Sequence, residues 1–109
     1  MARPDFERIL LEAVDEGLSS LGESPKLAVY FHLQESFNVK KEEISLNVEA
    51  FVDAMEKIFG QGAGFLEIII MKKLHEKIRG APVMHSSSDF TLTEYVASAR
   101  RGLLLKSRV

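Results

Sequence analysis

The sequence predicts an all-α fold, a single compact domain of about five helices over residues 1–109. Two observations lead to this prediction. Apolar residues recur at three- and four-residue spacing over most of the chain, which is the period of an amphipathic helix. The run Phe65-Leu66-Glu67-Ile68-Ile69-Ile70-Met71 is apolar on nearly every face, which predicts a central helix that other helices surround.

The first two helices have recognisable starts and stops. Pro4 suits a first turn, and Gly22 can take the left-handed conformation that ends a helix. Ser24 and Pro25 then provide an N-cap and a first-turn proline for a second helix that runs to about Phe37. The apolar positions of the second helix predict a broad buried face, made of Leu27, Tyr30, Phe31, Leu33 and Phe37.

The middle of the chain predicts a connector and two more helices. Residues 38–47 read as a polar turn, with a short helical turn as the alternative. Asn47 is the expected N-cap of a third helix, which Gly60 ends. One face of that helix holds Phe51, Val52, Met55, Ile58 and Phe59. The glycine-rich residues 60–64 then lead into the central helix, which runs through Ile78 and is ended by Gly80-Ala81-Pro82.

The last helix follows residues 83–89, a serine-rich segment that we expect to be the most mobile loop. Thr91 and Glu94 have the spacing of a capping box, which predicts a basic C-terminal helix over about 91–107. The expected inward stripe is Tyr95, Val96, Ala99 and Leu103.

Composition excludes several classes of function. The chain has no cysteine, so a disulfide framework, a thiolate metal site and a cysteine nucleophile are all excluded. No segment reaches the ~18 apolar residues of a membrane span, and the start lacks the apolar core of a signal peptide. We therefore expect a cytoplasmic protein with no membrane contact.

The charge is divided unevenly along the chain. Residues 1–60 carry twelve acidic and six basic side chains, whereas residues 61–109 carry four acidic and eight basic ones. One interpretation is that the two halves pack together and neutralise each other. The other is that the basic half offers a face to an acidic partner.

No motif predicts a metal, a cofactor or a catalytic group. His75-Glu76 resembles the start of a zinc-protease helix, but Arg79 stands where the second histidine is needed. His32 and Glu35 are one helical turn apart and are too few for a site. Residues 60–64 could hold an anion, although a helix C-cap and tight turn is the simpler interpretation. We therefore expect no enzyme activity.

Two surfaces are candidates for binding. Leu103, Leu104 and Leu105 cannot all face one interior, so they form a candidate interface with another chain or with the first helix. A candidate basic face requires the last two helices to lie side by side. It would consist of Lys72, Lys73, Lys77, Arg79, Arg100 and Arg101.

Part of the chain resembles a known family. The resemblance lies in residues 17–24 (Gly-Leu-Ser-Ser-Leu-Gly-Glu-Ser), 29–33, 41–44 and 58–63 (Ile-Phe-Gly-Gln-Gly-Ala). These segments resemble a small archaeal family of uncharacterised proteins, similar to the Nitrosopumilus output domain type, over about residues 6–78. The resemblance implies an archaeal, cytoplasmic, all-helical module with a role in regulation or interaction. It implies no reaction, so no site residue is carried over.

These observations lead to two hypotheses of function. The first is a regulatory or output module that acts through protein contacts without catalysis, as a homodimer that uses the last helix or with another protein. The alternative is a nucleic-acid-binding regulator that uses the basic C-terminal face. The two differ in a measurable way, because phosphate binding weakens steeply as salt rises.

Overall fold

A computed structural model describes residues 3–78 and 91–107, with the side chains of 6–78 and 91–101. Every element in this part of the chain is helical, which confirms the predicted all-α class. The elements are α1 (Arg3–Ser19), α2 (Glu23–Phe37), the 3₁₀ helix η1 (Lys41–Leu46), α3 (Val48–Phe59), α4 (Gly62–Lys77) and α5 (Leu92–Ser107). None of these helices is long and apolar enough to span a lipid bilayer.

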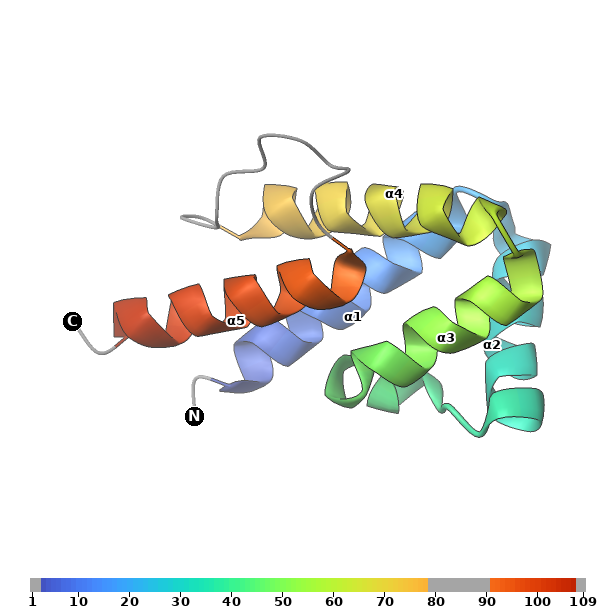
Figure 1. The fold of residues 1–109 in the computed structure, drawn as a ribbon, viewed down its shortest axis with the longest axis horizontal. Helices are drawn as coiled ribbons and strands as arrows, with labels where there is room; N and C mark the ends of the chain where they lie inside the picture. The colour runs from blue at the N-terminus through green and yellow to red at the C-terminus, as the bar shows by residue number, and fades with distance from the viewer. Residues whose placement is uncertain (1–2, 79–90, 108–109) are drawn as a thin grey trace.

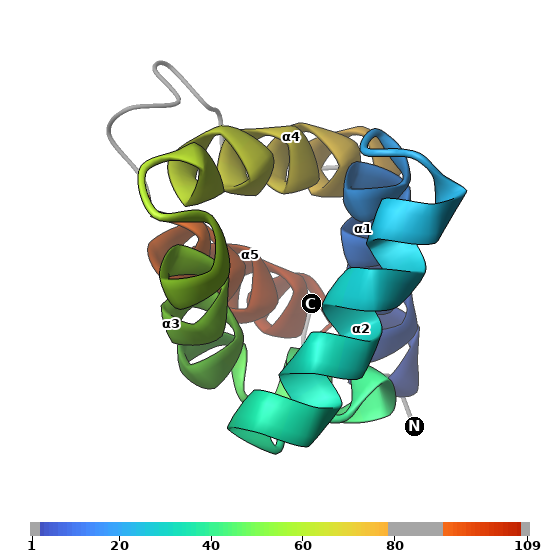
Figure 2. The same ribbon diagram turned by 90° about the vertical axis from the view of Figure 1, so that its right-hand side faces the viewer.

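The helices enclose one core. α1 packs along α4, while η1 and α2 lie against other sides of α1, and α3 contacts both α4 and α5. Figure 2 shows α1, α3 and α4 on three sides of the core, with α2 crossing in front of α1. In Figure 1, α2 lies at one end of the long axis and the end of α5 lies at the other.

The core contains the residues that the helical periodicity placed on inward faces. α1 contributes Leu10, Val14 and Leu18, all at most 1% exposed, and α3 contributes Phe51 and Met55, which are fully buried. Tyr95, Val96 and Ala99 of α5 are also buried, as predicted. α1 approaches α4 closely at Gly17, where a Cβ atom would lie 2.6 Å from the Ile70 Cγ1 atom.

Several predicted helix ends are confirmed by hydrogen bonds. The Asn47 side chain accepts a hydrogen bond from the Ala50 backbone N–H (3.2 Å) and caps α3. The capping box of α5 is complete, because the Glu94 N–H donates to Thr91 Oγ1 (3.1 Å) and the Thr91 N–H donates to Glu94 Oε1 (3.2 Å). Gly60, at φ 61°, ends α3.

Other helix ends differ from the prediction. Gly22 rather than Ser24 caps α2: its φ of 105° turns the chain directly after α1, so α2 begins earlier. α4 already begins at Gly62, so only Gly60 and Gln61 form the turn before it. α4 ends at Lys77, one residue earlier than predicted, because the backbone of Ile78 is extended. The predicted breaker 80–82 and the predicted loop 83–89 lie outside the described residues.

Candidate interaction surface

α2 is apolar on two opposite faces, and the fold buries only one of them. Val29 and Leu33 are at most 5% exposed, whereas Leu27 is 57% and Phe31 is 67% exposed. Leu27 and Phe31 are four residues apart, so they form one stripe on the outside of the helix. The prediction that they are buried is wrong, because α2 lies at the edge of the bundle and only one of its faces reaches the core.

A polar cluster centred on Asp15 of α1 fixes the rotation of α2. The Tyr30 hydroxyl donates a hydrogen bond to Asp15 Oδ1 (2.9 Å), and Lys26 Nζ donates one to Oδ2 (3.2 Å). Burial raises the pKa of Asp15, but these two hydrogen bonds together with the charges of Lys26 and Lys41 outweigh it and lower the pKa overall. The Lys41 ammonium lies over the Tyr30 ring, 4.9 Å from its centre. The cluster holds Tyr30 and Lys26 toward α1, which leaves Leu27 and Phe31 facing solvent.

An apolar groove adjoins this stripe. It lies between α2 and the end of α3 and has a volume of about 290 Å³. Its walls are Pro25, Ala28, Val29, His32, Ile58 and Phe59. Ala28 in the groove wall is three residues before Phe31, and residues at this spacing are neighbours on a helix surface, so the stripe and the groove adjoin. We call Leu27, Phe31 and the groove residues the α2–α3 face.

The charged groups at the ends of the exposed stripe are acidic. Glu23, with a side chain 73% exposed, stands one turn before Leu27, and the exposed Glu35 stands one turn after Phe31. Lys26 is the cation of α2, but its side chain is only 12% exposed because it turns toward Asp15 and Glu23. The outer side of α2 is therefore an apolar stripe between two carboxylates.

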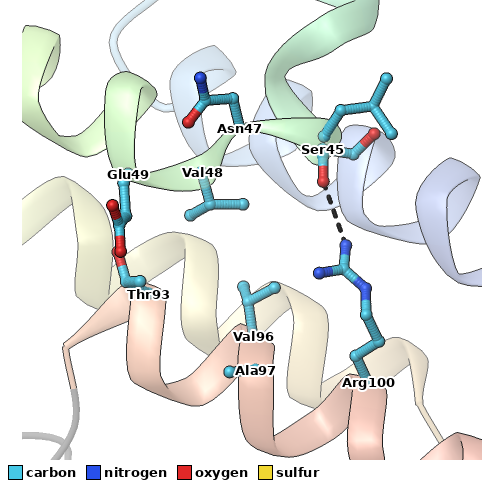
Figure 3. A pocket seen from close by; sticks show the side chains of 9 residues that line it. Ser45, Asn47, Val48, Glu49, Thr93, Val96, Ala97 and Arg100 are labelled. Carbon is cyan, nitrogen blue, oxygen red and sulfur yellow. Dashed lines mark hydrogen bonds between the residues drawn. The ribbon is translucent and has the colours of Figure 1, made fainter.

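A second hollow, of about 230 Å³, lies between the start of α3 and α5 (Figure 3). Figure 3 shows Arg100 reaching from α5 toward Ser45. Arg100 Nη2 donates to the Ser45 carbonyl (3.1 Å) and to the carboxylate of Glu7 (3.0 and 3.2 Å), and the guanidinium lies over the Phe6 ring. These contacts hold α5 against α1 and η1, so we assign Arg100 a structural role.

The predicted basic residues occupy different environments. Lys72 and Arg101 are exposed and Lys73 is half-buried, while Arg79 lies outside the described residues. Lys77 forms ion pairs with α1, at 2.7 Å from Glu16 and 3.7 Å from Glu12, and its hydrogen bond to Glu16 raises its pKa. Arg100 of α5 also forms an ion pair with α1, at 3.0 Å from Glu7. At Lys77 and Arg100, therefore, basic side chains of residues 61–109 neutralise acidic side chains of residues 1–60, as the first of the two interpretations of the charge division expects.

The other predicted candidates are placed as follows. α5 remains helical through Leu103, Leu104 and Leu105, whose side chains lie outside the described residues. Within the part of the chain that the structure describes, no three histidine or acidic side chains gather as a metal site would need. His75 Nδ1 and the Tyr95 hydroxyl share a hydrogen bond of 2.9 Å, which joins α4 to α5.

Glu67 is a buried acidic residue that the sequence prediction missed. It is 8% exposed, and it accepts a hydrogen bond from the Leu92 backbone N–H at the start of α5. Burial and the nearby charge of Glu56 raise the pKa of Glu67, and the Leu92 bond only partly offsets them. The sequence does contain an indication that Glu67 is buried, because it is the one charged residue in the apolar run 65–71.

Replacing Glu67 with glutamine should stabilise the protein at neutral pH. The raised pKa means that the fold favours the protonated acid, so the stabilising contribution of Glu67 is complete below its unfolded pKa. That contribution is lost as the pH rises through the folded pKa. Glu67→Gln stays uncharged and can still accept from Leu92, so its advantage in melting temperature should grow between about pH 4 and about pH 8.

The matched control is Glu56→Gln, which removes the same charge from an exposed position that influences Glu67 at a distance. Its effect on the melting temperature should be smaller. Circular dichroism melts across the pH series measure both variants. A loss of stability in Glu67→Gln that is largest at neutral pH and shrinks as the pH falls would show that the charged form is the one the fold needs.

Comparison with family models, curated proteins and solved structures gives no match for this chain. The function is therefore argued from geometry. Among the described surfaces, the α2–α3 face combines large exposed apolar side chains, an adjoining groove and a support that fixes their orientation.

Proposed function

We propose that this chain is a protein-interaction module, with a regulatory or output role in the cytoplasm, that docks a partner on the α2–α3 face. The observation that carries the proposal is the exposure of Leu27 and Phe31 on a helix whose rotation is fixed by Asp15. Exposed apolar patches with polar rims mark interaction sites in soluble proteins. Full burial of an exposed Leu or Phe side chain contributes roughly 1.5–3 kcal/mol. More than half of the Leu27 side chain and about two-thirds of the Phe31 side chain are open for such burial by a partner.

The two other classes of function have less support. Two groups of described polar side chains that could serve catalysis are engaged between helices: Asp15 with Tyr30 and Lys26, and His75 with Tyr95. For nucleic acid, Lys77 and Arg100 are neutralised by carboxylates of α1. The family resemblance also favours interaction or regulation over catalysis.

The test is affinity capture with three baits: the natural chain, Phe31→Glu and Phe65→Glu. Phe65 is a matched control because it is 70% exposed, close to the 67% of Phe31, but belongs to α4. The natural chain and Phe65→Glu should retain the same protein, whether another protein or the chain itself, and Phe31→Glu should lose it. If all three baits retain the same proteins, the α2–α3 face is not the docking surface.

A further inference from the structure

The charges on α2 argue against pairing of this helix with its own copy. Glu23 and Glu35 are twelve positions apart, about 18 Å along the helix, and they stand at the two ends of the Leu27–Phe31 stripe. An antiparallel pair of α2 helices would place Glu23 opposite Glu35, and a parallel pair would place each glutamate opposite itself. On the end of α3, the exposed Asp53, Glu56 and Lys57 have two negative charges and one positive charge, so this end is acidic as well. The α2–α3 face therefore favours an apolar segment with basic ends.

The chain itself contains such a segment at the end of α5. Leu103, Leu104 and Leu105 are preceded by Arg101 and followed by Lys106 and Arg108. α5 is helical through Ser107, and Arg101 is exposed. From residue 102 onward the side chains lie outside the described residues, and their identities are those of the sequence. In the sequence, basic residues stand on both sides of the three leucines, just as Glu23 and Glu35 stand on both sides of the Leu27–Phe31 stripe.

The position of α5 points to a second copy as the source of this segment. Figure 1 shows α2 and the end of α5 at opposite ends of the long axis, which measures 42 Å. One chain therefore cannot place its α5 end on its own α2–α3 face. Two chains side by side in opposite directions can do so, because each α5 end then lies beside the α2 of the other. A two-fold axis closes this arrangement and makes both contacts identical.

We propose that the α2–α3 face binds the leucine-containing end of α5, residues 101–108, from a second copy of this chain, and that two copies exchange these ends reciprocally. The inference rests on the proposed function and names its partner. Leu103, Leu104 and Leu105 supply the apolar contact to Leu27, Phe31 and the groove. The basic residues on either side of the leucines meet Glu23 and Glu35.

The test is complementation between two point variants, each of which lacks one side of the proposed contact. The mass in solution is measured by light scattering. The natural chain should have twice its 12.2 kDa mass. Phe31→Glu breaks the face and Leu104→Glu breaks the segment, so each variant alone should be a monomer. An equimolar mixture should recover dimers, because one of the two contacts pairs an intact face with an intact segment. Phe65→Glu, the control, should be dimeric alone.

A charge exchange tests the same contact without a change to the leucines. Lys106→Glu combined with Arg108→Glu should weaken the dimer about tenfold, and Glu35→Lys in the same chain should recover part of that loss. Far-UV circular dichroism of each variant checks that it is folded. This arm decides the question if Leu104→Glu is unfolded.

Each alternative result overturns the inference in a recognisable way. A dimer that persists in Leu104→Glu would place α2 against α2, and the α2–α3 face would still be an interaction surface. A dimer that persists in Phe31→Glu would place the leucines against each other. A natural chain that is monomeric at all concentrations would exclude the second copy, while the capture experiment would still test the proposed function.

Discussion

Replacing Tyr95 with alanine is expected to lower the free energy of unfolding by about 3–5 kcal/mol, the range for deletion of a large buried aromatic side chain. Tyr95 is fully buried in α5 and is among the largest such side chains in the described core. Small domains have a total stability of about 5–15 kcal/mol, so this loss would be a large part of it. Urea unfolding followed by circular dichroism measures the change.

Tyr95→Phe separates the ring from its hydroxyl. The ring continues to fill the core, but the hydrogen bond to His75 Nδ1 is lost, which should cost about 1 kcal/mol. Burial raises the pKa of Tyr95, so the hydroxyl is neutral at physiological pH and keeps its proton for hydrogen bonding. Equal losses in Tyr95→Phe and Tyr95→Ala would show that the hydroxyl, and not the volume of the ring, holds α5 in place.

Replacing Gly17 with alanine is expected to destabilise the protein by about 1–3 kcal/mol, although alanine is the better helix former. The added Cβ atom would lie 2.6 Å from Ile70 Cγ1 and 3.5 Å from Ile70 Cα. A β-branched side chain has few rotamers, so Ile70 cannot move aside unless α1 and α4 separate. Thermal and urea unfolding should both report the loss.

Gly64→Ala is the matched control for this prediction. Gly64 also lies inside a helix, but a Cβ atom there would meet nothing within 4 Å. The same substitution should therefore raise the free energy of unfolding by about 0.5–1 kcal/mol. In the double variant Gly17→Ala with Ile70→Ala, the loss should be smaller than the sum of the single losses. Stabilisation by Gly17→Ala would mean that α1 and α4 do not pack so closely.

The features that could be predicted from the sequence are those decided by neighbouring residues. Asn47, Gly60 and the pair Thr91 and Glu94 act on backbone groups within a few residues, so their roles follow from spacing. The class of the fold follows for the same reason, because helical periodicity is local.

The features that could not be predicted depend on distant parts of the chain. α2 is apolar on both sides, and nothing in its own residues shows that the side with Leu27 and Phe31 stays exposed. That outcome depends on Asp15, which lies in another helix. The ion pair of Arg100 with Glu7 joins residues 93 positions apart, so spacing gave no sign that this cation is neutralised.

The contact between Glu7 and Arg100 also has a consequence for biosynthesis. Among the described helices α1 is translated first, but it packs along α4, and its Glu7 pairs with Arg100 of α5, the last of them to be translated. Until α4 is translated, the apolar side of α1, with Leu10, Val14 and Leu18, lacks the helix that packs along it. The nascent chain therefore exposes the apolar side of α1 until α4 has been translated, which makes α1 a segment that chaperones would bind.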